Sequence, residues 1–164
     1  MADLTAILRS GAWLTRERVR LIAGGIAIAS LVGLVVLLAT ATGLNDRLGR
    51  PLGTDFSNVY AAGTYVLDGE PAKPFDPQAQ QAREQAIFGA GTPFYGWHYP
   101  PFFLALAALL ATMPYLLALA VWQGVTLVAY LWVIRGILNR HPLPAEVMRL
   151  WPLLALAFPA VFIN

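Results

Sequence analysis

Asp55 is the side chain of this sequence best placed for acid–base chemistry. It stands in GTDFSNVY, residues 53–60, shortly after a long apolar run. One interpretation is structural: Thr54 or Asp55 caps the first turn of a helix, and the side-chain oxygen accepts a hydrogen bond from a backbone N–H. The other is catalytic: Phe56 and Tyr60 partly shield the carboxylate from water, so it can accept a proton from a sugar hydroxyl. The two interpretations are compatible, because a capped carboxylate has a fixed position.

Further candidate functional residues, for substrate binding, lie in YGWHYPPFF, residues 95–103. An aromatic belt at the membrane interface explains most of this stretch. His98 is its one group that titrates near neutral pH, and it could hold a phosphate oxygen or move a proton. Gln123 lies inside a later apolar run, where we expect a hydrogen bond to a neighbouring helix before any substrate contact. A lipid phosphate could be held by Lys73, Arg83 or Arg50, although solvated surface charge is the ordinary role of each. The candidate substrate-binding residues are Tyr60, His98, Tyr99 and Lys73.

The composition indicates an integral membrane protein. Only 12% of the 164 residues are charged and 58% are hydrophobic, whereas a soluble domain carries about 25% charged residues. The formal net charge of +2 provides no basic stripe for nucleic acid. There is no cysteine, and the two histidines lack paired-ligand spacing. We therefore expect no dedicated metal site and no cofactor, and leave the help of a divalent ion open.

The first element that we expect is a transmembrane helix over residues 21–43. The run LIAGGIAIASLVGLVVLLATATG carries no charge and is long enough for the roughly 20 residues that cross a bilayer. Residues 1–20 form an amphipathic lead-in whose arginines favour a cytoplasmic N-terminus. A signal peptide is the alternative, with ATA as its cleavage site, but the length of the run favours a retained anchor.

Residues 44–99 form a polar connection that we expect outside the membrane, with helices of its own. Apolar residues after Asp55 recur with helical spacing until Asp68–Gly69, which predicts a helix lying along the membrane surface. The GRPLG stretch before it, residues 49–53, is expected to be flexible, so that the loop adapts around a substrate.

A second helix in this loop is better marked. Asp76 is expected at its N-cap, Pro77 at its first position and Gly89 just after its end. The flank QAQQAREQ is polar, so we expect the helix to face water or to form a lid.

Residues 100–137 are apolar again and are interrupted by MPY at residues 113–115. A single helix would far exceed the bilayer thickness, so we expect two short transmembrane helices broken there. With two full spans, which we favour, strict alternation puts three later arginines outside, against the positive-inside tendency. A re-entrant first piece would put them in the cytoplasm. These arginines are Arg135, Arg140 and Arg149.

The last apolar run, residues 150–164, is shorter than the roughly 20 residues of a transmembrane helix. We therefore expect it to be the start of a further, truncated transmembrane helix. The expected fold class is therefore all-α. We expect a polytopic membrane protein with an external loop that contains interfacial helices between spans 1 and 2.

Three features occur in order: one N-terminal span, then GTDFSNVYAAGTYVLDGEPAKPFDP, then YPPFFLALAALLATMPYLLALAVWQ. Together they resemble the start of polytopic glycosyltransferases of the C superfold, in particular family 87, the polyprenyl-phosphate-mannose-dependent mannosyltransferases. The resemblance covers about residues 53–134. The motifs that carry it are Asp55–Phe56, Tyr60–Ala61, Leu67 with Gly69, Phe75–Pro77, Tyr99–Pro101 and Val121–Trp122.

The resemblance implies that Asp55 deprotonates the acceptor hydroxyl. It also implies a polyprenyl-phosphate sugar as donor, mannose in particular, with phosphate as leaving group and inversion at the anomeric carbon. Such an enzyme works with membrane lipid, here in a bacterial inner membrane. Family members continue through further spans, so the chain is expected to be the N-terminal part of such an enzyme. The alternatives are a non-catalytic small membrane protein or partner subunit, and a transporter or channel fragment.

Overall fold

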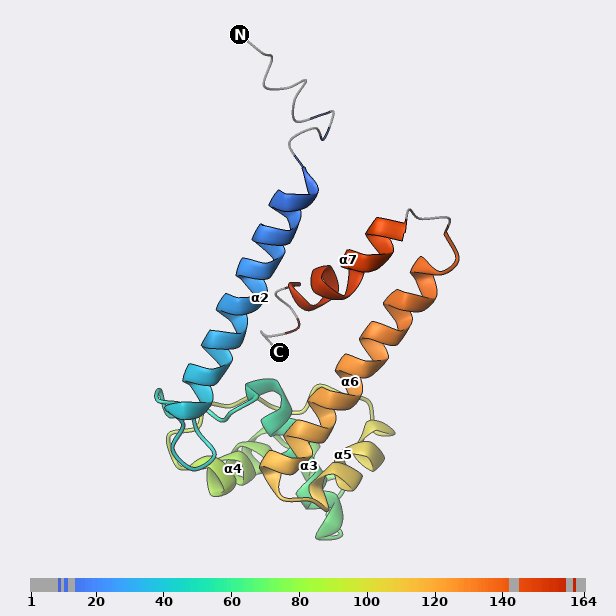
Figure 1. The fold of residues 1–164 in the computed structure, drawn as a ribbon. Helices are drawn as coiled ribbons and strands as arrows, with labels where there is room; N and C mark the ends of the chain where they lie inside the picture. Colours follow the sequence, from blue (N-terminus) through green and yellow to red (C-terminus); the bar gives the residue numbers. More distant parts are fainter. Residues whose placement is uncertain (1–8, 10, 12–13, 142–144, 159–160, 162–164) are drawn as a thin grey trace. The chain divides into compact units, whose positions relative to one another are not determined.

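The protein is seen in a computed structural model that describes residues 9, 11, 14–141, 145–158 and 161. In this part of the chain the regular secondary structure is helical (Figure 1). The prediction of an all-α fold is therefore confirmed. The helices are α2 (Arg16–Ala39), α3 (Thr54–Leu67), the 3-10 helix η1 (Lys73–Phe75), α4 (Pro77–Phe88), α5 (Phe103–Ala111), α6 (Tyr115–Leu138) and α7 (Ala145–Leu156).

The chain divides into two compact units, which are described separately. Val35–Ala129 forms one of them and contains α3, α4 and α5. The other consists of the described parts of residues 1–34 and 130–163. Within that second unit, the Tyr130 hydroxyl donates a hydrogen bond of 3.4 Å to the carbonyl of Ala155 on α7.

Two of the described helices, α2 and α6, are long and apolar enough to cross a membrane. Each has 24 residues, and at 1.5 Å per residue each is roughly 36 Å long, against about 30 Å of bilayer hydrocarbon. Both leave large apolar side chains uncovered, among them Leu21 at 74% exposure and Trp132 at 76%. Such exposure is unfavourable in water and suits contact with lipid.

The helices between residues 100 and 137 differ from the two short spans that the sequence suggested. The break lies at residues 112–114, and α5 before it has only nine residues. A helix of that length is roughly 13 Å long and cannot cross the hydrocarbon core. Of this pair only α6 has the length of a span.

The boundaries of the first and last apolar helices differ from those predicted from the sequence. α2 begins before residue 21 and ends before residue 43, and α7 begins before residue 150. α7 has 12 residues with Pro152 inside it. Most of the predicted lead-in, residues 1–20, and the end of the last apolar run lie outside the described residues.

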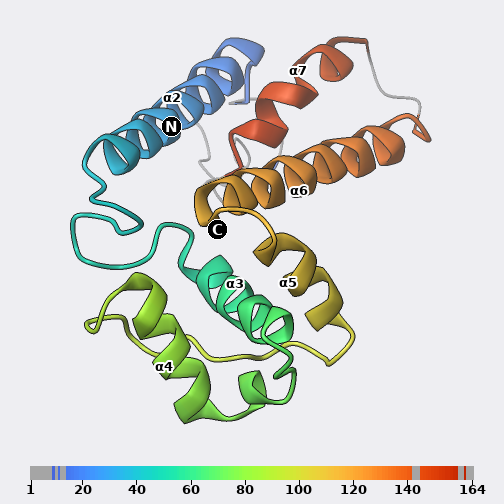
Figure 2. The same cartoon turned by 90° about the horizontal axis from the view of Figure 1, so that it is seen from below.

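α3 occupies the centre of the Val35–Ala129 unit. It lies between α4 and α5 and contacts both (Figure 2). The buried core forms around its apolar face, with aromatic rings packed edge to face, such as Phe88 on Tyr115 at 4.8 Å between centroids. The core residues are Phe56, Val59, Phe88, Ala107, Leu110, Tyr115 and Ala118.

Gly63 on α3 allows this helix to pack directly against the backbone of α5. A Cβ atom at this position would lie 2.1 Å from the Ala107 carbonyl oxygen and 2.9 Å from the Cβ of Ala111. Any side chain here would therefore push the two helices apart. α3 ends as predicted at Asp68 and Gly69, whose backbone N–H groups donate to carbonyls of its last turn.

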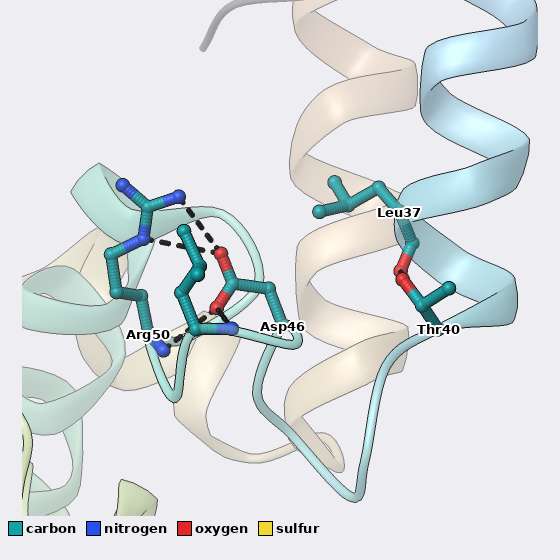
Figure 3. A network of polar contacts seen from close by, with 5 residues as sticks. Leu37, Thr40, Asp46 and Arg50 are labelled. Carbon is teal, nitrogen blue, oxygen red and sulfur yellow. Dashed lines mark hydrogen bonds and ion pairs between the residues drawn. The ribbon is translucent and has the colours of Figure 1, made fainter.

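The connection from α2 to α3 is held by Asp46 (Figure 3). Its Oδ1 accepts hydrogen bonds from the backbone N–H groups of Leu48, at 2.8 Å, and Arg50, at 2.9 Å. Its Oδ2 pairs with the guanidinium of Arg50 at 3.0 Å. The hydrogen bond from the Arg50 backbone is the main cause that lowers the pKa of Asp46. Pro51 and Leu52 are buried, so the GRPLG stretch is anchored where we expected flexibility.

α4 begins and ends as the sequence indicated. The Asp76 carboxylate accepts a hydrogen bond of 3.0 Å from the Gln78 N–H, Pro77 is the first helical residue, and Gly89 follows the last turn. The expectation that its polar flank faces water holds for Gln78, which is exposed, but was wrong for Gln80 and Glu84, which are fully buried. Gln80 Nε2 donates to the carbonyl of Asn58 on α3 at 3.0 Å, which is why a polar face packs inward.

Candidate functional site

Asp55 stands in the first turn of α3 and does not cap it. Gly53 takes the N-cap position, with a left-handed φ of 66°. This conformation favours glycine, and a Cβ there would lie 2.6 Å from Leu119 Cδ1. The Asp55 carboxylate is exposed, and no hydrogen bond or ion pair to it occurs within the described residues. The capping interpretation is thus wrong.

The Asp55 side chain borders a small cleft of about 70 Å³. α3 supplies one wall, the segment before α5 supplies Tyr99, and α6 supplies Trp122 and Gln123. The positive end of the α3 dipole favours a negative charge where the carboxylate stands. The lining residues are Gly53, Asp55, Phe56, Val59, Tyr99, Trp122 and Gln123.

Three of the seven residues that line the cleft are aromatic, and neighbouring rings support them. Phe56 stacks on Trp122 with 6.3 Å between ring centroids. Tyr99 stacks on Phe103 at 4.8 Å, and Phe103 meets Trp122 edge to face at 6.1 Å. Each ring is therefore fixed by at least one other, which gives the cleft rigid apolar sides beside a single carboxylate.

The Tyr95 phenol lies within electrostatic range of Asp55 and of the charged groups of the α2–α3 connection. Burial is the main cause that raises the pKa of the Tyr95 phenol; the positive charge of Arg50 opposes the shift, and the negative charges of Asp46, Glu84 and Asp55 add to it. The phenol is consequently neutral at physiological pH and can donate a hydrogen bond.

Of the four predicted substrate-binding residues, the structure brings only Tyr99 to the cleft beside Asp55. Tyr60 donates its hydroxyl to the Met113 carbonyl at 2.9 Å, and burial raises its pKa. Lys73 pairs with Glu70 at 3.0 Å, on η1. His98 is exposed, with Nε2 3.0 Å from the Tyr95 carbonyl oxygen.

Two features of the site were not predicted. Sequence reasoning gave Gln123 mainly a helix-packing role and gave Trp122 no place in a site, yet both line the cleft. Their position as polar and aromatic residues in an apolar helix was the available signal. Glu84 was missed entirely, because a solvated helix flank and a buried acid have the same local sequence.

The described residues contain no group of three or more His, Cys, Asp or Glu side chains that could hold a metal ion. The Asp55 carboxylate, exposed at the edge of the cleft, can act as a general base. An aromatic wall suits the apolar C–H face of a sugar ring, and a carboxylate beside it suits a sugar hydroxyl.

Comparison with known protein families gives a match for the later part of the chain. The model of glycosyltransferase family 87 matches residues 97–164. This segment includes Tyr99, Trp122 and Gln123 of the cleft and begins after Asp55. No curated protein and no solved structure matches the chain. The predicted resemblance is confirmed over this segment, and the carboxy-terminal part of the chain is similar to family 87 glycosyltransferases.

Proposed function

We propose that the protein is a membrane glycosyltransferase, or the N-terminal part of one, that transfers a sugar, mannose by its resemblance, from a polyprenyl-phosphate donor to an acceptor hydroxyl. The observation that carries the proposal is the Asp55 carboxylate, exposed and without a hydrogen-bond or ion-pair partner in the described chain, at the edge of an aromatic cleft. The match to glycosyltransferase family 87 over residues 97–164 supports the same reaction class.

In the proposed reaction Asp55 acts as general base. It accepts the proton of the acceptor hydroxyl while that oxygen attacks the anomeric carbon of the donor sugar. The bond from the anomeric carbon to the phosphate oxygen breaks, and the polyprenyl phosphate leaves with the electron pair. A single displacement of this kind inverts the anomeric configuration, and it needs no further reactant.

The size of the cleft limits what it holds. Its volume of about 70 Å³ is well below the roughly 300 Å³ of a small-molecule site. The cleft therefore receives one edge of a sugar, packed between Tyr99 and Trp122, and the rest of the donor lies outside it. A polyprenyl tail in the bilayer would present its sugar at the membrane surface.

The lengths of the helices support one membrane topology, which we propose for a bacterial inner membrane. α2 crosses outward and α6 crosses back, while α5 is too short to cross. The connection with Asp55 is then external. Arg135, Arg140 and Arg149 return to the cytoplasmic side, in agreement with the positive-inside tendency. This is the re-entrant alternative of the sequence analysis, which we had not favoured.

The test is transfer of radiolabel from polyprenyl-phosphate [³H]mannose to acceptors in membranes that contain the protein. Asp55→Asn and Asp55→Ala are expected to lower kcat about 10²-fold to 10⁴-fold, since each removes the base. Asp68→Asn is the matched control, because Asp68 is an exposed acid paired with Arg83 at 2.7 Å. Near-normal turnover in both Asp55 variants would remove this residue from the mechanism.

A further inference from the structure

Glu84 is a fully buried acid on α4. Its Oε2 accepts a hydrogen bond from the backbone N–H of Tyr95 at 3.1 Å, and its Oε1 accepts one from the N–H of Gly96 at 3.2 Å. Gln80 donates to the same Oε1 from Nε2 at 3.1 Å. One carboxylate thus satisfies two consecutive backbone donors and a side-chain amide.

The segment that Glu84 holds has no regular structure of its own. Residues 89–102 connect α4 to α5 without a helix or strand, so their backbone groups depend on other partners. The two N–H groups bound by Glu84 lie just before Trp97 and Tyr99. The Trp97 ring packs against the Tyr99 ring at 5.2 Å, and Tyr99 lines the cleft with Asp55.

We propose that Glu84 is a positioning residue, which fixes the Tyr99 wall of the cleft opposite Asp55 without touching the substrate. The inference rests on the proposed glycosyltransferase function, because it assigns Tyr99 a contact with the substrate. It assigns Glu84 a second task beyond packing α4: to hold the segment from Tyr95 to Tyr99 at a fixed distance from α3.

Position 84 requires a carboxylate because three hydrogen-bond donors point at this side chain. It offers about four acceptor sites for the three hydrogen bonds that it receives. In Glu84→Gln one oxygen becomes an NH₂ group, so at least one backbone N–H faces another donor. The backbone of Tyr95 or Gly96 must then move, and Tyr99 moves with it.

The kinetic test compares Glu84→Gln with Glu70→Gln in membranes, using polyprenyl-phosphate [³H]mannose. Tyr99 contacts the bound sugar before and during reaction alike, so Glu84→Gln is expected to raise KM for the donor about tenfold with kcat within about twofold. Glu70→Gln removes an exposed acid of the same unit and should leave both constants unchanged. A fall in kcat with unchanged KM, as partial unfolding produces, would overturn the proposal.

If Glu84→Gln does not accumulate in the membrane, Glu84→Asp decides the question. It keeps the acid but withdraws it by one methylene, so it cannot reach both N–H groups. The same rise in KM is expected, and a wild-type KM in Glu84→Asp contradicts the positioning role.

A second readout needs no substrate. The chain has no cysteine, so Thr92→Cys places a single thiol on the segment that connects α4 to α5, at a position that is buried in the folded protein. Its reaction with a maleimide in detergent should be about tenfold faster in Glu84→Gln than in Glu70→Gln, because the segment opens locally. Equal rates would overturn the proposal. Absence of sugar transfer by the complete wild-type gene product would instead remove the proposed function, while the labelling rates still decide whether Glu84 holds the segment.

Discussion

Gly63 provides the sharpest test of how the α3–α5 pair is built. In Gly63→Ala the new Cβ would lie 2.1 Å from the Ala107 carbonyl oxygen and 2.5 Å from its carbonyl carbon. Backbone atoms cannot rotate away as a side chain can, so the two helices must separate. Ala107 is fully buried and Leu110 nearly so, and the separation would therefore open the core.

The magnitude follows from two opposing effects. Overpacking against the α5 backbone costs about 3 kcal/mol, the upper end of its usual range, and alanine returns about 1 kcal/mol because glycine is a poor helix former. The net loss of about 2 kcal/mol corresponds to a Tm lower by about 4–8 °C for a chain of this size.

The assay is thermal unfolding of the purified protein in detergent, followed by circular dichroism. Gly124→Ala is the matched control: it makes the same change inside α6, at a position where a Cβ meets nothing within 4 Å. Its Tm is expected to equal that of the wild type or to exceed it. If Gly63→Ala behaves like Gly124→Ala, the close approach of α3 and α5 is not real and the reasoning is refuted.

Two further predictions concern the loop and the membrane. The pKa of Asp46 is lowered in the folded state, so its stabilisation is complete above the unfolded pKa of about 3.9 and is lost as pH falls through the folded value. Asp46→Asn should therefore cost about 1–3 kcal/mol near pH 7, with the difference from wild type vanishing in acid; an unfolding series from pH 7 to pH 2 measures this, and a difference independent of pH would contradict it. In the cysteine-free chain, Ala72→Cys should react with a membrane-impermeant maleimide added outside intact cells, and Arg140→Cys only after permeabilisation; labelling of both from outside would show that α6 does not return the chain to the cytoplasm.

Local sequence was sufficient wherever a helix begins or ends through short-range chemistry. Asp76, Pro77 and Gly89 mark α4 because capping and proline geometry act within one turn. Asp68 and Gly69 end α3 for the same reason. The all-α class and the two long apolar helices follow from composition and periodicity, which the sequence contains in full.

Tertiary packing decided the rest, because it depends on residues far apart in the chain. Glu84 is buried since the backbone of a later segment supplies donors for it, which no local pattern reveals. Gly53 takes the cap position expected for Thr54 or Asp55, because the backbone there has a left-handed φ of 66°, which favours glycine.

The cleft shows most clearly which features follow from the sequence and which depend on tertiary packing. The sequence by itself determined that GTDFSNVY, which follows an apolar span, carries one acid, Asp55, directly before aromatic residues. Only the fold decided that Tyr99, Trp122 and Gln123 stand beside that acid, while Tyr60 and Lys73 are used in other contacts. The sequence specifies the type of each residue, but the neighbours of that residue depend on which distant segments of the chain pack together.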